Sequence, residues 1–188
     1  MTAKQDIYIA LIHYPIVNKH GNIVTTSVTN FDIHDLARTS RTYGIKQVFF
    51  VTPNPQQQNM VNTICDYWQE GIGAAYNPDR KDAIHLVKAA ESLEDSCLTI
   101  EKTSGIRPAL LATTAKLLPK SLSYETVRRE WIAEAKRPLL IAFGTGHGLA
   151  EEFLAKCDGI LAPIAGKGEY NHLPVRSAVA IILDRLLS

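Results

Sequence analysis

The stretch Ile7 to Ile12 (IYIALI) is apolar at every position. A strand with one face in water alternates apolar and polar residues, whereas a strand covered on both faces is apolar throughout. Strands of the second kind belong to parallel sheets whose faces are packed with helices. The first strand therefore predicts an α/β fold with a mostly parallel sheet and helices on both faces.

The rest of the chain alternates helical and extended patterns. A second strand, Gln47 to Thr52, follows a helix that Asn30 or Asp32 can cap and that Gly44 ends. The buried stripe expected on that helix is Ile33, Leu36, Ala37, Ser40 and Tyr43. Further helices are expected near Gln57 to Glu70, Pro78 to Leu93, Ser123 to Lys136 and Leu149 to Lys156 and from Pro174 onward, and further strands near Leu98 to Glu101, Ala109 to Ala112, Leu139 to Phe143 and Gly159 to Ala162.

Two glycine-rich turns, Gly144 to Leu149 (GTGHGL) and Ala165 to Tyr170 (AGKGEY), each follow an expected strand. Glycine lets the main chain approach a bound molecule and leaves amide N–H groups available at the strand end, where α/β sheets bind ligands. A dinucleotide fingerprint fits poorly, because its third glycine falls one position early at Gly148. A phosphate loop fits worse, because Gly168 stands where Ser or Thr is required. The turns predict a ligand pocket of another kind.

The composition limits the function classes. At 188 residues and 46% apolar residues the chain fits one domain, and its net charge of +1 excludes a strongly basic coat but permits a local patch. Cys65, Cys97 and Cys157 lack the close spacing of zinc ligands and indicate reduced thiols in the cytoplasm, with no metal site. No apolar run reaches the about 18 residues of a membrane span, so no membrane role is expected.

Arg38 is expected on the face of the first helix opposite its apolar stripe, and two interpretations are open. In one, Arg38 is a solvated side chain paired with Asp35, three residues earlier, which contributes only about 0.2–0.5 kcal/mol. In the other, Arg38 is a clamp for a phosphate or a substrate, for which a planar, permanently charged guanidinium is suited.

Three segments in order resemble the motifs of the SpoU branch of the SPOUT superfamily of RNA methyltransferases. The first is Asp32 to Gly44 (DIHDLARTSRTYG), where Arg38, Thr39 and Tyr43 fall on the motif. The second is Leu139 to Leu149 (LLIAFGTGHGL), and the third runs from Ala162-Pro163-Ile164 through HLPV to SAVAIILDRLL. The segments HYPIVNKHG and TSVTNFDIHDLAR also resemble a bacterial SPOUT group whose members can occur fused to tRNA guanine methyltransferases.

The chain departs from the SpoU motifs at several positions. Asp32 and His34 replace the Asn and Gly of the first motif, and the second motif is one residue shorter and lacks its Glu. His172 and Pro174 replace the Ser and Asn of the third motif. These changes leave open whether the methyl acceptor is a ribose or a base.

The resemblance implies a single domain over 1–188, with a Rossmann-like part at about 1–108 and a deep trefoil knot at about 109–188. It implies S-adenosylmethionine as cofactor, held among three strand-end loops. It also implies a homodimer through the knot and the last helix, with a site shared between subunits. The cofactor-binding residues expected on this basis are Thr113, Thr114, Gly144, Thr145, Gly146, His147, Gly148, Ile164, Gly166, Gly168, His172 and Leu173.

The resemblance places Arg38 at the methyl acceptor. Asp32, at the start of the same helix, is the candidate general base, with a helix cap as the open alternative. RNA contacts are expected from His13, Arg41, Lys167 and Arg176, and tRNA is the favoured RNA.

Three functions are therefore compared. The leading hypothesis is an S-adenosylmethionine-dependent RNA methyltransferase. The second is a non-catalytic SPOUT module that binds cofactor and RNA or supports a partner methyltransferase. The third is an unrelated Rossmann-like oxidoreductase, which preferential binding of NAD would favour.

Overall fold

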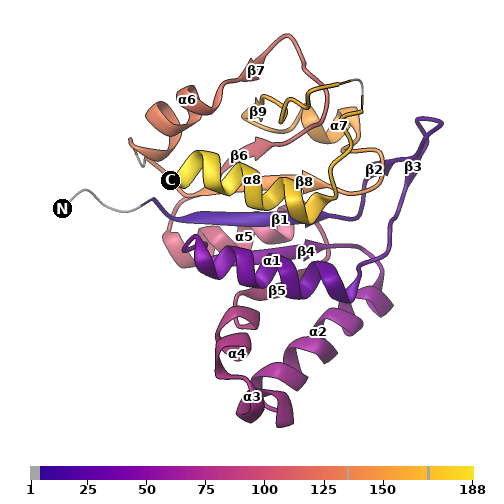
Figure 1. The fold of residues 1–188 in the computed structure, drawn as a ribbon, viewed down its shortest axis with the longest axis vertical. Coiled ribbons are helices and arrows are strands. Elements are labelled where there is room, and N and C mark those ends of the chain that lie inside the picture. Colours follow the sequence, from indigo (N-terminus) through magenta and orange to yellow (C-terminus); the bar gives the residue numbers. More distant parts are fainter. Residues whose placement is uncertain (1–4, 135, 169) are drawn as a thin grey trace.

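The computed structural model describes residues 5–134, 136–168 and 170–188. Within these residues, seven strands form one sheet in the order β5-β4-β1-β8-β6-β9-β7, and all neighbours in it run parallel (Figure 1). A separate antiparallel ribbon pairs β2 with β3. The strands are β1 (Ile7–Ile12), β2 (Ile16–Val17), β3 (Ile23–Val24), β4 (Gln47–Val51), β5 (Val87–Ala90), β6 (Ala109–Ala112), β7 (Ser121–Leu122), β8 (Leu139–Gly144) and β9 (Gly159–Leu161).

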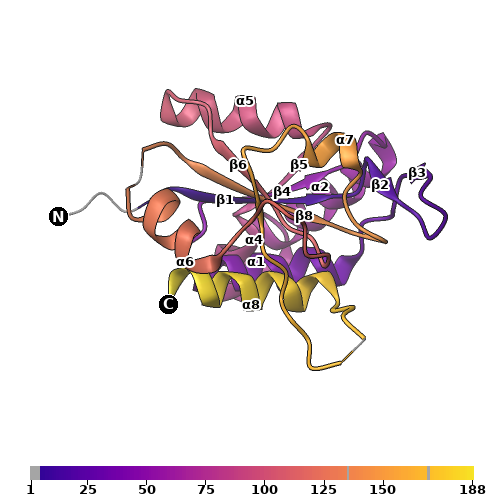
Figure 2. The same ribbon diagram turned by 90° about the horizontal axis from the view of Figure 1, so that it is seen from above.

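Helices cover both faces of the sheet, as the first strand predicts (Figure 2). Helices α1, α2, α4 and α8 pack on the face of β1 that carries Ile7, Ile9 and Leu11, and α5 and α7 pack on the other face. The helices are α1 (Asn30–Thr42), α2 (Pro55–Gln69), α3 (Ile72–Tyr76), α4 (Pro78–Ile84), α5 (Leu93–Ser104), α6 (Tyr124–Thr126), the π-helix η1 (Val127–Ile132), α7 (Glu151–Leu154) and α8 (Val175–Leu187).

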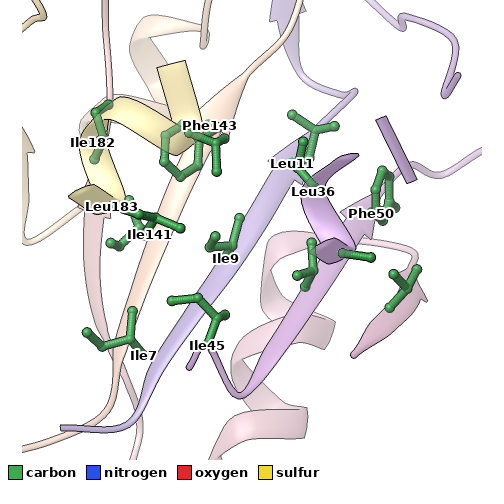
Figure 3. Packing of buried hydrophobic residues seen from close by; sticks show 14 of the residues in the cluster. Ile7, Ile9, Leu11, Leu36, Ile45, Phe50, Ile141, Phe143, Ile182 and Leu183 are labelled. Atoms are coloured by element: carbon green, nitrogen blue, oxygen red, sulfur yellow. The ribbon is translucent and has the colours of Figure 1, made fainter. Parts of the chain in front are cut away.

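The larger core lies between the sheet and the pair α1 and α8. Leu36 of α1 and Leu183 of α8 project toward the apolar side chains of β1 and β8 (Figure 3). Full burial of one such side chain stabilises the fold by about 1.5–3 kcal/mol. Because both helices pack on the same face, the first motif and the last motif of the chain become neighbours.

Two expected elements are wrong. The helix expected over Pro78 to Leu93 ends at Ile84, and the chain then forms β5. The main-chain N–H of Thr52 donates to the carbonyl of Ala90 at 2.9 Å, so pairing with β4 decides the conformation there. The strand expected over Leu98 to Glu101 lies inside α5, which Ser92 caps and Gly105 ends with a φ of 76°.

Three other expected boundaries shift. Thr29, rather than Asn30 or Asp32, is the N-cap of α1. The helix expected over Leu149 to Lys156 is confined to Glu151–Leu154. The charged helix expected over Ser123 to Lys136 continues from α6 as the π-helix η1, and its residue Ala135, like Glu169 of the second glycine-rich turn, lies outside the described residues. In the described part of the chain, the helices are too short or too polar to cross a membrane.

Candidate functional site

Three neighbouring strands end in the three loops that carry the expected ligand contacts. The central strand β6 pairs with β8 on one side and β9 on the other, with Ala112 in register with Ala142 and with Ile160. Since all three strands are parallel, their carboxyl ends meet at one edge of the sheet. The loops that follow β6, β8 and β9 therefore begin at that edge (Figure 1). They contain Thr113 and Thr114, the turn 144–148, and the described loop residues 162–168 and 170–174.

The turn after β8 is held against the ribbon strand β2. The N–H of His147 donates to the carbonyl of Val17 at 3.2 Å, and the N–H of Val17 donates to the carbonyl of Gly148 at 3.0 Å. Gly146 has a φ of 56°, and a Cβ there would lie 3.0 Å from the Cγ2 atom of Ile16. Glycine is therefore required at Gly146 for its conformation and for a close approach.

The expectation of free amide groups is wrong for most of this turn. The N–H groups of Thr145, His147 and Gly148 donate to carbonyls of the chain. The N–H of Gly146 alone among these four makes no hydrogen bond to another described residue. Hydrogen bonds within the chain thus fix the turn, and the N–H of Gly146 is its one available donor among these residues.

A buried chain of hydrogen bonds joins the end of β1 to the same turn. The Nδ1 atom of His13 lies 3.0 Å from the hydroxyl of Thr26, which lies 2.5 Å from the hydroxyl of Thr145. The hydroxyl of Thr145 donates to the carbonyl of Ile12 at 3.0 Å. The carbonyl of Ile12 can only accept, so Thr145 accepts from Thr26 in this chain, and this arrangement favours the His13 tautomer with its proton on Nδ1. The hydroxyl of Thr26 also lies 3.4 Å from the carbonyl oxygen of His13.

His13 is fully buried, and its Nε2 atom has no partner within the described residues. Burial lowers the pKa of His13 to about 4, although the carboxylate of Asp32 acts in the opposite direction. The imidazole is therefore neutral near pH 7. A buried side chain has no surface to offer RNA, so the expected RNA contact through the His13 side chain does not fit this structure.

The loop after β9 offers more open main chain. The N–H groups of residues 164–168 make no hydrogen bond to another described residue. Asn171 ties the loop to the one after β6, because its Nδ2 atom donates to the carbonyl of Ala115 at 3.3 Å. Gly166, Lys167, Gly168, His172 and Leu173 are exposed, and the ring of His172 stands edge-on to Tyr170. Main-chain N–H groups of this kind can donate hydrogen bonds to the acceptor atoms at the edge of a flat heterocycle.

An open cleft of about 530 Å³ lies between α1 and α8, where the third loop ends. Its lining residues come from these two helices and their ends: Asp35, Arg38, Thr39, Thr42, Tyr43, Pro174, Arg176, Ser177 and Ala180. The fold thereby brings Arg38 of the first motif beside Pro174, the last residue of the third loop. The cleft contains hydroxyl groups and two guanidinium groups, which suit an anionic ligand.

Arg38 is exposed, and its side chain makes no ion pair or hydrogen bond with another described residue. Of the two open interpretations, the pair between Asp35 and Arg38 is wrong, because Asp35 accepts instead from Arg176 of α8, with Nη1 and Oδ2 2.6 Å apart. Arg38 therefore remains available at the mouth of the cleft.

Asp32 serves the start of α1. The hydroxyl of Thr29 donates to Oδ2 of Asp32 at 2.6 Å, and the same hydroxyl oxygen accepts from the N–H of Asp32 at 3.2 Å. The Nε atom of Arg176 lies 3.6 Å from the other carboxylate oxygen, and Asp32 is only 8% exposed. Asp32 is therefore not the N-cap itself; its carboxylate holds the cap residue Thr29 at the start of the helix and pairs with Arg176.

The remaining expected RNA contacts differ in their surroundings. Arg41 pairs with Asp82 at 2.6 Å, and both side chains are more than half exposed, so the pair contributes at most about 1 kcal/mol. Lys167 is exposed on the third loop. Arg176 is committed to Asp32 and Asp35.

The described residues contain no group of three or more His, Cys, Asp or Glu that could hold a metal ion.

The sequence interpretation missed Thr26 and Phe31 as parts of the site. Thr26 joins His13 to Thr145, and Phe31, 69% exposed, lies under the guanidinium of Arg176 at 5.5 Å from its ring centroid. Both residues lie in the segment TSVTNFDIHDLAR, which the resemblance had marked. Their partners are far away along the chain, so no local spacing could have indicated these contacts.

Comparison with known proteins agrees with this geometry. The model of a family described as SAM-dependent RNA methyltransferase matches residues 6–188. A tRNA (guanine-N(1)-)-methyltransferase of Oleidesulfovibrio alaskensis is 42% identical over 97% of this chain, which spans only 42% of that protein. An uncharacterised protein of Aquifex aeolicus is also 42% identical, over 98% of this chain and 89% of its own length.

The fold is likewise similar to a solved structure of the SpoU class. The match to the crystal structure of the A. aeolicus TrmH/SpoU tRNA modifying enzyme covers 99% of this chain and 76% of the chain of that enzyme, with a TM-score of 0.57 and 14% sequence identity. This similarity agrees with the fold that the three motifs led us to expect. The family match over residues 6–188 confirms the expected class of protein: the chain belongs to the family of S-adenosylmethionine-dependent RNA methyltransferases.

Proposed function

We propose that this chain transfers the methyl group of S-adenosylmethionine to a nucleotide of tRNA. The observation that carries the proposal is the position of Arg38, which is exposed in the cleft where α1 meets the end of the third strand-end loop. The choice of tRNA is supported by the relative of O. alaskensis named a tRNA (guanine-N(1)-)-methyltransferase, although this chain spans less than half of that protein.

The loops at the sheet edge fit the cofactor by their chemistry. The unpaired N–H groups of residues 164–168 and of Gly146 can recognise the adenine and ribose. Thr113 fixes the start of the loop after β6, since its hydroxyl donates to the carbonyl of Ala142 in β8 at 3.0 Å. When bound, S-adenosylmethionine supplies a methyl group made electrophilic by the sulfonium. The residues proposed to hold it are Thr113, Thr114, Gly144, Thr145, Gly146, His147, Gly148, Ile164, Gly166, Gly168, His172 and Leu173.

The proposed role of Arg38 is to bind the acceptor nucleotide through its phosphate and so to orient the acceptor atom. A guanidinium is charged at every accessible pH and binds phosphate through two parallel hydrogen bonds, so it restricts the geometry of the bound group. Lys167 and Arg41 are proposed as further phosphate contacts, and Arg41 would exchange its exposed carboxylate partner Asp82 for RNA. Asp32 supports the helix that carries Arg38.

The proposed architecture is one domain over 1–188 with the trefoil knot in 109–188. The strand order supports it, because β9 lies between β6 and β7 although it follows both along the chain. We further propose a homodimer that pairs through the knot and α8, in the cytoplasm. This pairing is proposed from the resemblance to the SpoU branch, whose members pair through these elements.

Calorimetric titration of the protein with S-adenosylmethionine and with NAD, followed by methyl transfer to RNA, tests the proposal. We expect binding of S-adenosylmethionine, weak or no binding of NAD, and a methylated RNA product. Cofactor binding without transfer to any RNA would instead favour the non-catalytic module.

A further inference from the structure

Three charged residues lie on successive turns of α1: Asp35 and Arg38 line the cleft, and Asp32 is buried at the start of the helix. Asp32 and Asp35 precede Arg38 by six and three residues, and pairs three residues apart meet on a helix surface. With no other partner, Asp35 would attract the guanidinium of Arg38. These turns of α1 would then carry two negative charges and one positive charge, which repels phosphate.

Arg176 changes this balance from the neighbouring helix. Its Nη1 atom donates to Oδ2 of Asp35 at 2.6 Å, and its Nε atom lies 3.6 Å from Oδ1 of Asp32. The ring of Phe31 lies under the guanidinium, with 5.5 Å from its carbon to the ring centroid. These three contacts come from one turn of α1 and fix both the position and the plane of the guanidinium.

We propose that Arg176 is a positioning residue that takes up both carboxylates of α1 and so keeps Arg38 free for RNA phosphate. The proposal rests on the proposed function, in which Arg38 binds RNA phosphate. It also assigns Arg176 a different role from a direct RNA contact. The cleft then presents Arg38 as its available cation, beside a cluster in which Arg176 reduces the charge of Asp32 and Asp35 from −2 to −1.

The test is a rescue experiment. Arg176→Gln should lower kcat/KM for RNA about tenfold, equivalent to ~1.4 kcal/mol, because Asp35 becomes free to pair with Arg38. Adding Asp35→Asn to Arg176→Gln should recover most of that loss, since the competing charge is gone. Arg176→Lys should fall between the wild type and Arg176→Gln, because an ammonium keeps the charge but lacks the planar fork. Unfolding curves of all variants verify that each one folds.

A second readout does not depend on activity. Phenylglyoxal reacts with accessible guanidinium groups, and mass spectrometry of peptides gives the reaction rate of Arg38. We expect this rate to fall in Arg176→Gln and to recover in Arg176→Gln/Asp35→Asn. This pattern in a protein without methyl transfer would support the positioning role and contradict the proposed function.

The opposite pattern overturns the inference. If Arg176→Gln loses activity, Asp35→Asn restores none of it and the reactivity of Arg38 is constant, then Arg176 acts as a direct RNA contact or as a structural link between helices. Full activity and unchanged Arg38 reactivity in Arg176→Gln would also overturn it.

Discussion

The hydroxyl oxygen of Thr26 lies 2.5 Å from the hydroxyl oxygen of Thr145, although 119 residues separate them in the sequence. This contact connects the segment after the β2–β3 ribbon to the glycine-rich turn after β8. The buried imidazole of His13 completes the connection on the other side of Thr26. The conformation of a proposed cofactor loop is thus set by residues from the N-terminal part of the chain.

Replacement of Thr26 by Val should destabilise both the fold and the turn. The change keeps the shape of the side chain but leaves the Nδ1–H of buried His13 without an acceptor, which costs about 1–3 kcal/mol. We expect the urea unfolding midpoint to fall and the Kd for S-adenosylmethionine to rise. Thr103→Val is the control, because the hydroxyl of Thr103 bonds only within the exposed surface of α5. Equal behaviour of the two variants would refute the bracing role of Thr26.

Gly146→Ala should weaken cofactor binding far more than Gly105→Ala. Both glycines have positive φ, 56° and 76°, so each substitution costs about 1–2 kcal/mol of backbone strain. A Cβ at Gly146 would also press on Ile16 and Thr26, at 3.0 and 3.3 Å, whereas a Cβ at Gly105 meets nothing within 4 Å. Titration calorimetry with S-adenosylmethionine should show a loss of affinity only for Gly146→Ala. A normal Kd in that variant would argue against the proposed pocket.

Stability should fall in acid because of His13. Its pKa of about 4 in the folded protein lies below the ordinary value of 6.5, so the unfolded chain takes up the proton first as the pH falls. The stabilising contribution is therefore fully present above about pH 6.5 and is lost toward pH 4, with a size on the order of 3 kcal/mol.

The variant His13→Asn isolates this contribution. The carboxylates titrate in both proteins, so the difference in unfolding free energy between wild type and His13→Asn removes most of their effect. We expect the wild type to lose unfolding free energy relative to His13→Asn as the pH falls from 7 to 4, as measured by urea titrations. Parallel stability curves would show that the folded protein does not hold His13 neutral.

Arg38→Ala should abolish most methyl transfer and leave the Kd for S-adenosylmethionine nearly unchanged. Loss of the contact that orients the acceptor nucleotide lowers methyl transfer by about a hundredfold. Arg38→Lys should recover little, because lysine lacks the planar fork. The matched control is Arg107→Ala, since Arg107 pairs with Glu94 of α5 on the other face of the sheet. Undiminished turnover of Arg38→Ala would contradict the role of Arg38.

Features with a local cause could be predicted from the sequence. The apolar run Ile7–Ile12 is fully buried in the middle of the sheet, between β4 and β8, as its pattern indicates. The buried residues of α1 include Ile33, Leu36, Ala37 and Ser40, which follow the expected stripe. By contrast, Leu98 to Glu101 is a short run that periodicity cannot assign, and its capping residue Ser92 lies outside it.

The parts of the site that could not be predicted depend on tertiary contacts. Asp35 has a sequence neighbour of opposite charge in Arg38, yet it pairs with Arg176, 141 residues away. His13 follows a strand at its carboxyl end, where ligand contacts are common, but its side chain is fully buried and lies against the hydroxyl of Thr26. Only the packing of α8 beside α1 and of β2 beside the turn decides these partners.

The central claim is tested most directly by methyl transfer to RNA. Purified protein is incubated with labelled S-adenosylmethionine and tRNA from a strain that lacks this gene, and the product is digested to nucleosides for mass spectrometry. We expect one new methylated nucleoside with wild-type protein and almost none with Arg38→Ala, and its mass spectrum assigns the methyl group to ribose or base. No labelled nucleoside, under conditions in which cofactor binding is demonstrated, would contradict the proposed methyltransferase activity.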